Sequence, residues 1–332
     1  MNSDRLEPAG AIPPLPKGEG TCPHDMGFTP RGSFTLIELL VVITIIGILV
    51  GLPYAGLDAA RTATQINRTR STIAKLHHLV MAKYESFRTR RVPIDVSSLT
   101  MGSSPASMRQ IAHLRLQGIR EIMRMELPER YLDLGAPAQL SLPTKGTITI
   151  PNTALFNAYL TFRSQKNPAQ QEPEYGSAQI LYMIIMVGCP SGRQQFSEDE
   201  IGDQNGDGWP EFLDAWGNPI MFLRWAPGFN DSAIQSNDPV NQHDPFDPMN
   251  TEPGAYQLLP LIYSAGPDGI YDILVADDNY TYFKDPNHSP YTNIGSPVVS
   301  PNNYSHTNVS VAGNRKVPAN LDNIHNHRMG LK

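Results

Sequence analysis

The chain has 332 residues, of which 40% are hydrophobic and only 17% are charged, and its net charge at pH 7 is −6. This length and hydrophobic content are sufficient for one substantial domain or two small ones. The negative charge and the lack of a basic stripe argue against a nucleic-acid partner. Two cysteines, Cys22 and Cys189, offer neither a disulfide framework nor the spacing of zinc ligands.

The first predicted element is an apolar segment that contains a carboxylate. Residues 34–55 are apolar apart from two threonines and Glu38. A plain membrane anchor or a cleaved secretory signal would explain the hydrophobicity. Neither explains the charge, which costs about 2.5–3.5 kcal/mol inside a lipid bilayer.

The residues around this carboxylate, GSFTLIELLVV at 32–42, resemble the type III signal of prepilins, which type IV pilins and type II secretion pseudopilins share. The resemblance implies that a membrane prepilin peptidase cleaves just before Phe34 and methylates the new amino group. The family has Gly directly before the Phe, whereas here Ser33 follows Gly32. Cleavage after Ser33 makes Glu38 the fifth residue of the mature chain, whereas cleavage after Gly32 makes it the sixth. We favour cleavage of the bond between Ser33 and Phe34. Residues 1–33 are then a leader, in which Met26 is the expected start and 1–25 an extension.

The resemblance also implies a purpose for Glu38. Its carboxylate lies four residues from the new ammonium group of Phe34, on one face of a helix. In a filament it can instead pair with the Phe34 ammonium of a neighbouring subunit. Assembly would therefore supply the partner that the buried charge requires.

Small residues follow within the same segment. Gly47 and Gly51 form a GxxxG pattern, which lets helices approach closely in lipid or in a filament core. Pro53 removes one helical hydrogen bond and predicts a loosening of the helix at this point.

The helix is expected to continue to residue 92, so that residues 34–92 form one transmembrane and assembly helix. Its second half carries a stripe of apolar residues at helical spacing, which predicts packing on a globular head: Ile66, Ile73, Leu76, Val80, Tyr84 and Phe87. We interpret His77 and His78 as surface residues of this helix, and not as metal ligands.

Residues 93–188 are predicted to be mainly helical. A helix is expected to start at Ser104-Pro105 and to end before Pro128. Two more candidates are 154–162 and 175–187, the second of which is apolar enough to be buried. Such an insertion is large for a pilin-like protein.

Residues 189–284 change character and predict short strands between Gly, Pro and Asp turns. The segments DAWGNPIMFLRW and YQLLPLIYSAGPDGIYDI resemble the D-x-W-G-x-P and S-x-G-x-D-G signatures in the sheet of the major, G-type pseudopilin of type II secretion. Residues 285–332 are rich in Pro, Asn and Ser and predict an extended or partly disordered tail. The expected fold class is α+β: a long N-terminal helix, a helical insertion and a small antiparallel sheet with long loops.

One loop, DQNGDGWPEFLD, has the spacing of a calcium-binding loop. It follows the first half of an EF-hand loop, with an Asp in place of the usual Glu at the twelfth position, and its predicted ligands are Asp203, Asn205, Asp207, Trp209 through its carbonyl, and Asp214. An ordinary turn is the alternative, because Asp, Asn and Gly are common in turns and Pro210 is unusual in such a loop. By resemblance to the major pseudopilin, a second and weaker calcium site would comprise Asp268, Asp272, Asp277 and Asp278.

The sequence contains no motif of a nucleotide-binding or hydrolytic enzyme, and we expect a non-enzymatic protein. His325 and His327 lie in the predicted tail without a cysteine nearby. The resemblance implies a pseudopilin-like structural subunit of a type II secretion or type IV pilus-like filament, anchored once in the bacterial inner membrane with its head in the periplasm. Its expected partners are prepilin peptidase, copies of itself and other pseudopilins. The alternatives are a minor pilin of a type IV or competence pilus, and a monomeric membrane-anchored calcium-binding module.

Overall fold

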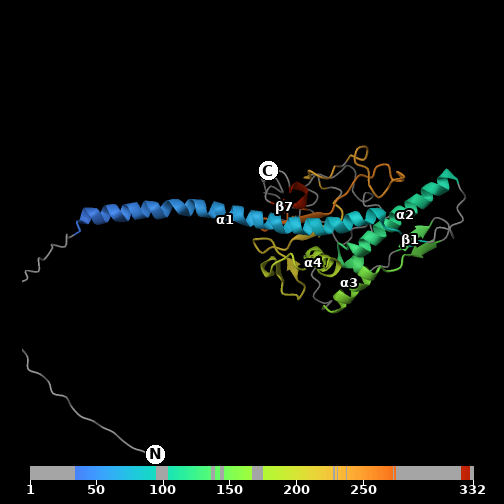
Figure 1. Ribbon diagram of the computed structural model, residues 1–332, viewed down its shortest axis with the longest axis horizontal. Helices are drawn as coiled ribbons and strands as arrows, with labels where there is room; N and C mark the ends of the chain where they lie inside the picture. The colour runs from blue at the N-terminus through green and yellow to red at the C-terminus, as the bar shows by residue number, and fades with distance from the viewer. Residues whose placement is uncertain are drawn as a thin grey trace, which may run out of the picture. The chain divides into compact units, whose positions relative to one another are not determined.

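The protein is described here by a computed structural model, which covers residues 34–94, 104–135, 139–142, 146–166, 175–226, 229, 231–236, 238–271, 273 and 323–329. The chain divides into two compact units, residues 1–55 and residues 56–332. We refer to the second unit as the head. The described residues form helices and short antiparallel strands, so the expected α+β class is confirmed (Figure 1).

Helix α1 runs without interruption from Leu36 to Ser86 and is followed by a short 3-10 helix, η1 (Phe87–Thr89). The helix continues through Pro53, so the predicted loosening at this residue is not observed. Among residues whose side chains are described, none forms a helix with both the length and the apolarity needed to cross a membrane. The side chains of residues 49–56, in the middle of the predicted span, lie outside that set.

The second half of α1 packs into the head as its apolar stripe predicts. Five of the six stripe residues are almost fully buried, namely Ile73, Leu76, Val80, Tyr84 and Phe87, and Ile66 is partly buried. Burial of this face removes a continuous apolar surface from water, which is the main favourable term in folding. The predicted contact between this helix and the head is therefore confirmed.

Three further helices follow in the head: α2 (Pro105–Glu126), α3 (Ala154–Ser164) and α4 (Gly176–Gly188). Ser104 caps α2, since its hydroxyl oxygen accepts a hydrogen bond from Ser107 N at 3.2 Å, and Thr153 caps α3 in the same way from Phe156 N. Helix α4 is buried over most of its length and packs on α3. All three predicted helices are confirmed.

The same region also contains a hairpin that the prediction of a mainly helical segment missed. Strands β1 (Gln139–Leu142) and β2 (Gly146–Thr149) pair antiparallel. Gly146 has a φ of 81°, a conformation that side chains with a Cβ rarely adopt. Between α2 and this hairpin lies a 3-10 helix, η2 (Tyr131–Leu134).

The remaining elements in the described part of the head are five short strands and two 3-10 helices: η4 (Glu198–Glu200), β3 (Ile201–Gly202), β4 (Glu211–Phe212), β5 (Met221–Leu223), β6 (Leu261–Ser264), β7 (Ile324–His325) and η8 (Asn326–Arg328). Strands β3 and β4 form a hairpin, and β5-β6-β7 form an antiparallel sheet in that order. In this sheet Tyr263 lies opposite Met221 on one side and His325 on the other. The strands expected in the two resembling segments are thus confirmed. The prediction of an extended tail is wrong for residues 323–329, which add a buried strand to the sheet.

A group of buried charges connects the end of α2 to β5. Arg224 is fully buried, and its Nη1 donates to Asp133 Oδ2 at 3.0 Å and to the carbonyl oxygen of Leu127 at 2.8 Å. The backbone N–H of Arg224 donates to Glu129 Oε2 at 3.0 Å. Burial raises the pKa of Glu129, and the nearby Arg130 and Arg224 oppose this rise. The charges therefore compensate one another inside the core.

Replacing Arg224 by Met should destabilise the head strongly, because it leaves the Asp133 carboxylate buried without its cation. The free energy of unfolding should fall by about 3–5 kcal/mol, measured by thermal or denaturant unfolding. Arg88→Met is the matched control, since its pair with Glu85 is solvent-exposed and should change stability by less than about 1 kcal/mol. Equal losses in the two variants would contradict a structural role for the buried pair.

Candidate functional site

The N-terminal candidate site begins at the first turn of α1. Gly32 and Ser33 lie outside the described residues, while Phe34 is exposed. Thr35 and Glu38 bond reciprocally: Thr35 N and Thr35 Oγ1 each donate to Glu38 Oε2 at 2.9 Å, and Glu38 N donates to Thr35 Oγ1 at 3.3 Å. This is a capping box, which satisfies donors that the helix start leaves open. Glu38 therefore has a partner within its own subunit, a role that the T-x-x-E spacing could have revealed.

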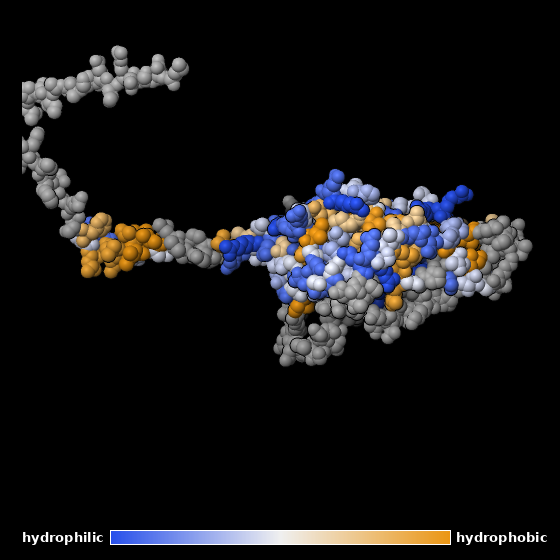
Figure 2. Space-filling view, turned by 90° about the horizontal axis from the view of Figure 1, so that it is seen from below, coloured by the Kyte–Doolittle hydropathy of each residue, from blue (hydrophilic) through white to orange (hydrophobic). Residues whose placement is uncertain are grey.

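The side chains that follow Glu38 present an apolar surface. The large apolar residues of this segment are all between 44% and 82% exposed: Phe34, Leu36, Ile37, Leu39, Leu40, Val41, Val42, Ile43, Ile45, Ile46 and Ile48. Figure 2 shows them as an orange surface at the described start of the chain. A Cβ added at Gly47 would meet no atom within 4 Å, so this glycine leaves open space on the helix. Gly51 and Pro53 lie in α1, but their surroundings are outside the described side chains.

The second candidate site is the loop between β3 and β4, where the hairpin brings distant acidic residues together. One carboxylate oxygen from each of Asp203, Asp207 and Glu211 lies within 4.8 Å of the others. The loop can turn this sharply because Gly206 and Gly208 adopt positive φ angles of 72° and 83°. Among the described residues this is the one group of three acidic, His or Cys side chains close enough to hold a metal ion.

Backbone amides of the loop hold the carboxylates in place. Asp203 accepts hydrogen bonds from Asp207 N at 3.0 Å and from Gly208 N at 2.7 Å. Asp207 accepts one from Trp209 N at 2.7 Å and one from the side-chain amide of Asn205 at 2.9 Å. The Trp209 ring is buried and meets the rings of Tyr131 and Phe162 edge to face, so it anchors the loop to the head.

One residue outside the loop, Gln179, stabilises two of its carboxylates by donating hydrogen bonds. Gln179 Nε2, from α4, donates to Asp207 Oδ2 at 2.9 Å and to Glu211 Oε1 at 2.8 Å. Burial raises the pKa of Glu211 to about 7, and the Asp207 and Asp203 charges add to the rise, against hydrogen bonds from Gln179 and Gln204. Without a bound cation the carboxylates therefore repel one another, and a proton on Glu211 competes with a metal for the same oxygen.

The donor set of this loop suits a hard cation such as calcium, which takes carboxylate, amide and carbonyl oxygens. Asp203, Asn205 and Asp207 lie together as the sequence predicted. The third carboxylate comes from Glu211, at the ninth position of the loop, which is not among the predicted ligands. The signal was available, because the ninth position also contributes to EF-hand loops.

Asp214, predicted as the twelfth ligand, lies apart from this group and holds another turn. Its Oδ1 accepts from Trp216 N at 2.9 Å and from Asn218 N at 2.8 Å, and its Oδ2 accepts from Ser264 Oγ at 2.6 Å. Asn218 Nδ2 also donates to the carbonyl oxygen of Gly266 at 3.3 Å. Asp214 therefore joins the two segments, around 214–219 and 264–269, that resemble the pseudopilin signatures.

The second predicted calcium site is described only at Asp268. This residue is exposed, and its Oδ1 accepts a hydrogen bond from Ile270 N at 2.8 Å, as in an ordinary turn. Asp272, Asp277 and Asp278 lie outside the described residues. This site stays a prediction.

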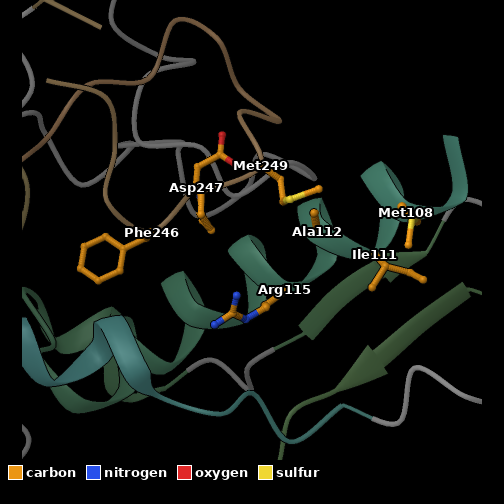
Figure 3. Close-up of a pocket in the computed structure, with 8 residues that line it drawn as sticks. Met108, Ile111, Ala112, Arg115, Phe246, Asp247 and Met249 are labelled. Carbon is orange, nitrogen blue, oxygen red and sulfur yellow. The ribbon is translucent and has the colours of Figure 1, made fainter. Parts of the chain in front are cut away.

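A pocket of about 260 Å³ lies between α2 and the loop 246–249. Figure 3 shows its walls, which are mostly apolar: Met108, Ile111, Ala112, Arg115, Phe246, Asp247, Pro248 and Met249. The Asp247 carboxylate is committed to its own loop, where it accepts hydrogen bonds from the backbone N–H groups of Thr251 and Glu252. The lining therefore offers no pair of converging acid and base groups, and we assign no function to this pocket.

Comparison with known proteins identifies one feature. Residues 30–52 match the family described as the Prokaryotic N-terminal methylation motif. This motif is the recognition site of prepilin peptidase and indicates a pilin-like protein that this peptidase processes. No curated protein and no solved structure matches the chain.

If the loop 203–211 binds calcium, calcium should raise the melting temperature of the full-length protein in mild detergent. The stabilisation should reach about 2.7 kcal/mol at one hundred times the dissociation constant, because the ion binds only the folded loop. Asp207→Ala and Glu211→Gln should each remove most of the difference between calcium and EDTA.

Two further variants are the controls. Asp214→Ala should lower the melting temperature equally in calcium and in EDTA, because its carboxylate holds a turn and not the ion. Asp268→Ala should leave the calcium effect intact. If the effect survives in Asp207→Ala but vanishes in Asp268→Ala, the ion binds the later loop. Identical wild-type curves in calcium and EDTA would mean that both loops are ordinary turns.

Proposed function

We propose that this protein is a pseudopilin-like structural subunit of a filament of the type II secretion or type IV pilus kind, and has no enzymatic activity of its own. The methylation motif at residues 30–52 carries the proposal, because it marks the chain for cleavage and N-methylation by prepilin peptidase. The 51-residue helix α1 begins within this motif, at Leu36. A filament subunit of this kind needs a long N-terminal helix with an apolar first part. That part anchors the subunit in a membrane before assembly and packs in the filament core afterwards.

The exposed apolar side chains of 34–48 support this assembly role. An apolar surface of this extent is unfavourable in water and calls for a cover of lipid or of other protein chains. In the proposed cycle the bacterial inner membrane covers it first, with a single-pass orientation and the head in the periplasm. Neighbouring α1 helices, of this subunit and of other pseudopilins, replace the lipid on assembly, and Gly47 and Gly51 allow close approach.

The carboxylate of Glu38 has two alternative binding partners in this proposal. In the isolated chain it accepts hydrogen bonds from Thr35. After cleavage, the ammonium group of Phe34 in a neighbouring subunit offers a charged partner, and a charge-assisted bond is stronger than a neutral one. If Glu38 exchanges Thr35 for this ammonium group, the new pair stabilises the one axial offset between adjacent α1 helices at which the two groups meet.

The link between Asp214 and Ser264 favours a relation to the major pseudopilin of type II secretion. Asp214 and Ser264, one from each resembling segment, are 50 residues apart in the sequence, yet a hydrogen bond of 2.6 Å joins their side chains. The two segments that carry the resemblance therefore lie side by side in the head. The alternative within the same class is a minor pilin of a type IV or competence pilus, which would use the same processing.

We also propose calcium as a structural ion of the loop 203–211. The cluster of Asp203, Asp207 and Glu211 supports it. This cluster also supports the third possibility, a membrane-anchored calcium-binding module that remains monomeric. Crosslinking in cells with and without prepilin peptidase separates the two, because only a filament subunit gives peptidase-dependent ladders.

Processing gives the most direct test. The mature protein should begin with an N-methylated Phe34, because the peptidase recognises the motif at residues 30–52. Mass spectrometry of the N-terminal peptide from cells that contain the peptidase measures this. A first residue of Ser33 would only move the site by one bond. An intact leader, or cleavage beyond Leu52, would refute the proposed processing.

The assembly role of Glu38 predicts a separation between cleavage and polymerisation. Glu38→Ala should be cleaved normally but should form few crosslinked multimers, because the charged partner of Phe34 is lost. Glu38→Asp should be intermediate, since the shorter side chain reaches less far. Both are measured by N-terminal mass spectrometry and by crosslinking in cells.

Thr35→Ala is the control for the helix cap. It removes the hydroxyl partner of Glu38 but retains the carboxylate, and the loss of a cap costs about 1 kcal/mol of helix stability. It should therefore assemble far better than Glu38→Ala. If the two variants assemble equally poorly, the role of Glu38 is to cap α1. Normal multimers from Glu38→Ala would show that the carboxylate is dispensable for assembly.

A further inference from the structure

The segment 323–329 lies beside α1 in the head and completes the sheet (Figure 1). Residues 323–327 are all buried, although the sequence predicts an extended tail here. Strand β7 pairs with β6, and Ala233 N donates to the carbonyl oxygen of His327 at 3.1 Å. The segment therefore bonds to β6 on one side and to the 231–235 loop on another.

Asn326 bonds this segment to α1. Its Oδ1 accepts from the backbone N–H of Ile262 at 2.8 Å, which fixes the orientation of the amide. Its Nδ2 then donates to the carbonyl oxygen of Pro260 at 2.8 Å and to His77 Nδ1 at 2.9 Å. Because an amide nitrogen can only donate here, His77 Nδ1 must carry no proton while the bond exists.

His327 is subject to a similar condition. Its Nε2 lies 3.1 Å from the carbonyl oxygen of Pro260 and must donate, because a carbonyl oxygen can only accept. Its Nδ1 is buried and has no hydrogen-bond partner. Protonation of Nδ1 would therefore place a charge and an unsatisfied donor in the interior.

The charged and titratable groups around these rings come from three elements. On α1, His78 adjoins His77; in the segment itself, His325 and Arg328 lie near His327; and the 231–235 loop supplies Asp231. Asp231 Oδ2 accepts from His325 Nε2 at 3.2 Å, and Asp231 also pairs with Arg328. Within the described part of the chain, the carboxylate of Asp231 that faces the cluster is thus shared with an arginine.

We propose that residues 323–329 form a clasp that stays closed while His77 and His327 are neutral and opens on acidification, which uncovers the edge of β6 and the His77 side of α1. The bond from Asn326 Nδ2 requires a neutral His77, because protonation converts its acceptor Nδ1 into a donor. His327 can still donate from Nε2 to Pro260 when it is charged, but its buried Nδ1–H would then lack an acceptor. An opened β6 presents unpaired backbone groups, which are a template for pairing with another strand.

The direction of the pH effect follows from the protonation states. Burial lowers the pKa of His77 and of His327, the latter to about 3, and the neighbouring histidines add to both effects. Burial also lowers the pKa of His325, against the opposing effect of Asp231. In the open state these rings return towards the ordinary value of about 6.5. The clasp is therefore fully stable above pH 6.5, and its closed-to-open ratio falls by up to about tenfold per histidine for each pH unit below it.

The clasp can be followed through Met329, whose side chain packs against the core. We would label the methionine methyl groups of the full-length protein with ¹³C and record spectra between about pH 8 and about pH 5. The Met329 resonance should move to the position of an exposed methionine, for which Met108 is the reference. The resonance of Met183, which is fully buried in α4, should not move, because the clasp opens without unfolding the head.

His77→Gln combined with His327→Gln is the informative variant, since Gln can accept at 77 and donate at 327 but does not titrate. Its opening midpoint should fall by more than one pH unit. His78→Gln is the matched control, because this neighbour on α1 is exposed and acts on His77 only through its charge, so its midpoint should shift far less than that of the double variant.

Two outcomes would overturn the proposal: a Met329 resonance that does not move on acidification, or equal midpoints in the double variant and the wild type. If Met329 is not packed in the double variant even near pH 8, the proposal is tested on the wild-type protein instead. The imidazole resonances of His77 and His327 must then titrate together with the Met329 shift, and titration at a separate pH would refute the clasp.

Discussion

The buried face of α1 is the contact on which the described head depends, because segments from very different parts of the chain bond to it. These bonds run from Thr69 to Ala215, from Thr72 and Lys75 to Glu200, from Lys83 to Glu126, from Tyr84 to Leu258 and from His77 to Asn326. The strands of the head are two to four residues long and could not hold these segments by themselves. The helix supplies the missing scaffold, and its polar bonds set the position of each segment along it.

The same helix presents two different surfaces along its length. Its described first part exposes apolar side chains, whereas from residue 66 onward one face is buried in the head and the other carries charges. The proposed filament subunit would use both surfaces, since the first part would pack with lipid or with other helices and the second holds the folded head. Helix α1 is continuous through Pro53, between these two parts.

Local signals predicted much of this structure, and tertiary contacts explain what they missed. The caps at Ser104 and Thr153 and the stripe on α1 depend on spacing within a few turns, so the sequence was sufficient to place those helices. The hairpin β1–β2 carries a short polar–apolar alternation, QLSL and GTIT, which the prediction of a mainly helical region overlooked. Strand β7 is only two residues long and depends on its pairing with β6. Glu211 occupies a loop position that the EF-hand pattern could have indicated, but its hydrogen bond from Gln179, 32 residues earlier, is a tertiary contact that the loop sequence does not contain. The role of Asp214 likewise depends on Ser264, which lies in a different loop.

The position of β7 also has a consequence for the order in which the head can fold. The bond between Asn326 and His77 joins residues 249 positions apart, and the loop-closure entropy of so distant a contact slows its formation. During synthesis, residues 261–264 emerge about 60 residues before residues 324–325 that cover their edge. A nascent chain therefore passes through a state in which β7 does not yet pair with β6, and an unpaired strand edge is prone to pair with a second chain. Protection of this intermediate, by rapid completion of the chain or by a chaperone, is a requirement that the topology itself imposes.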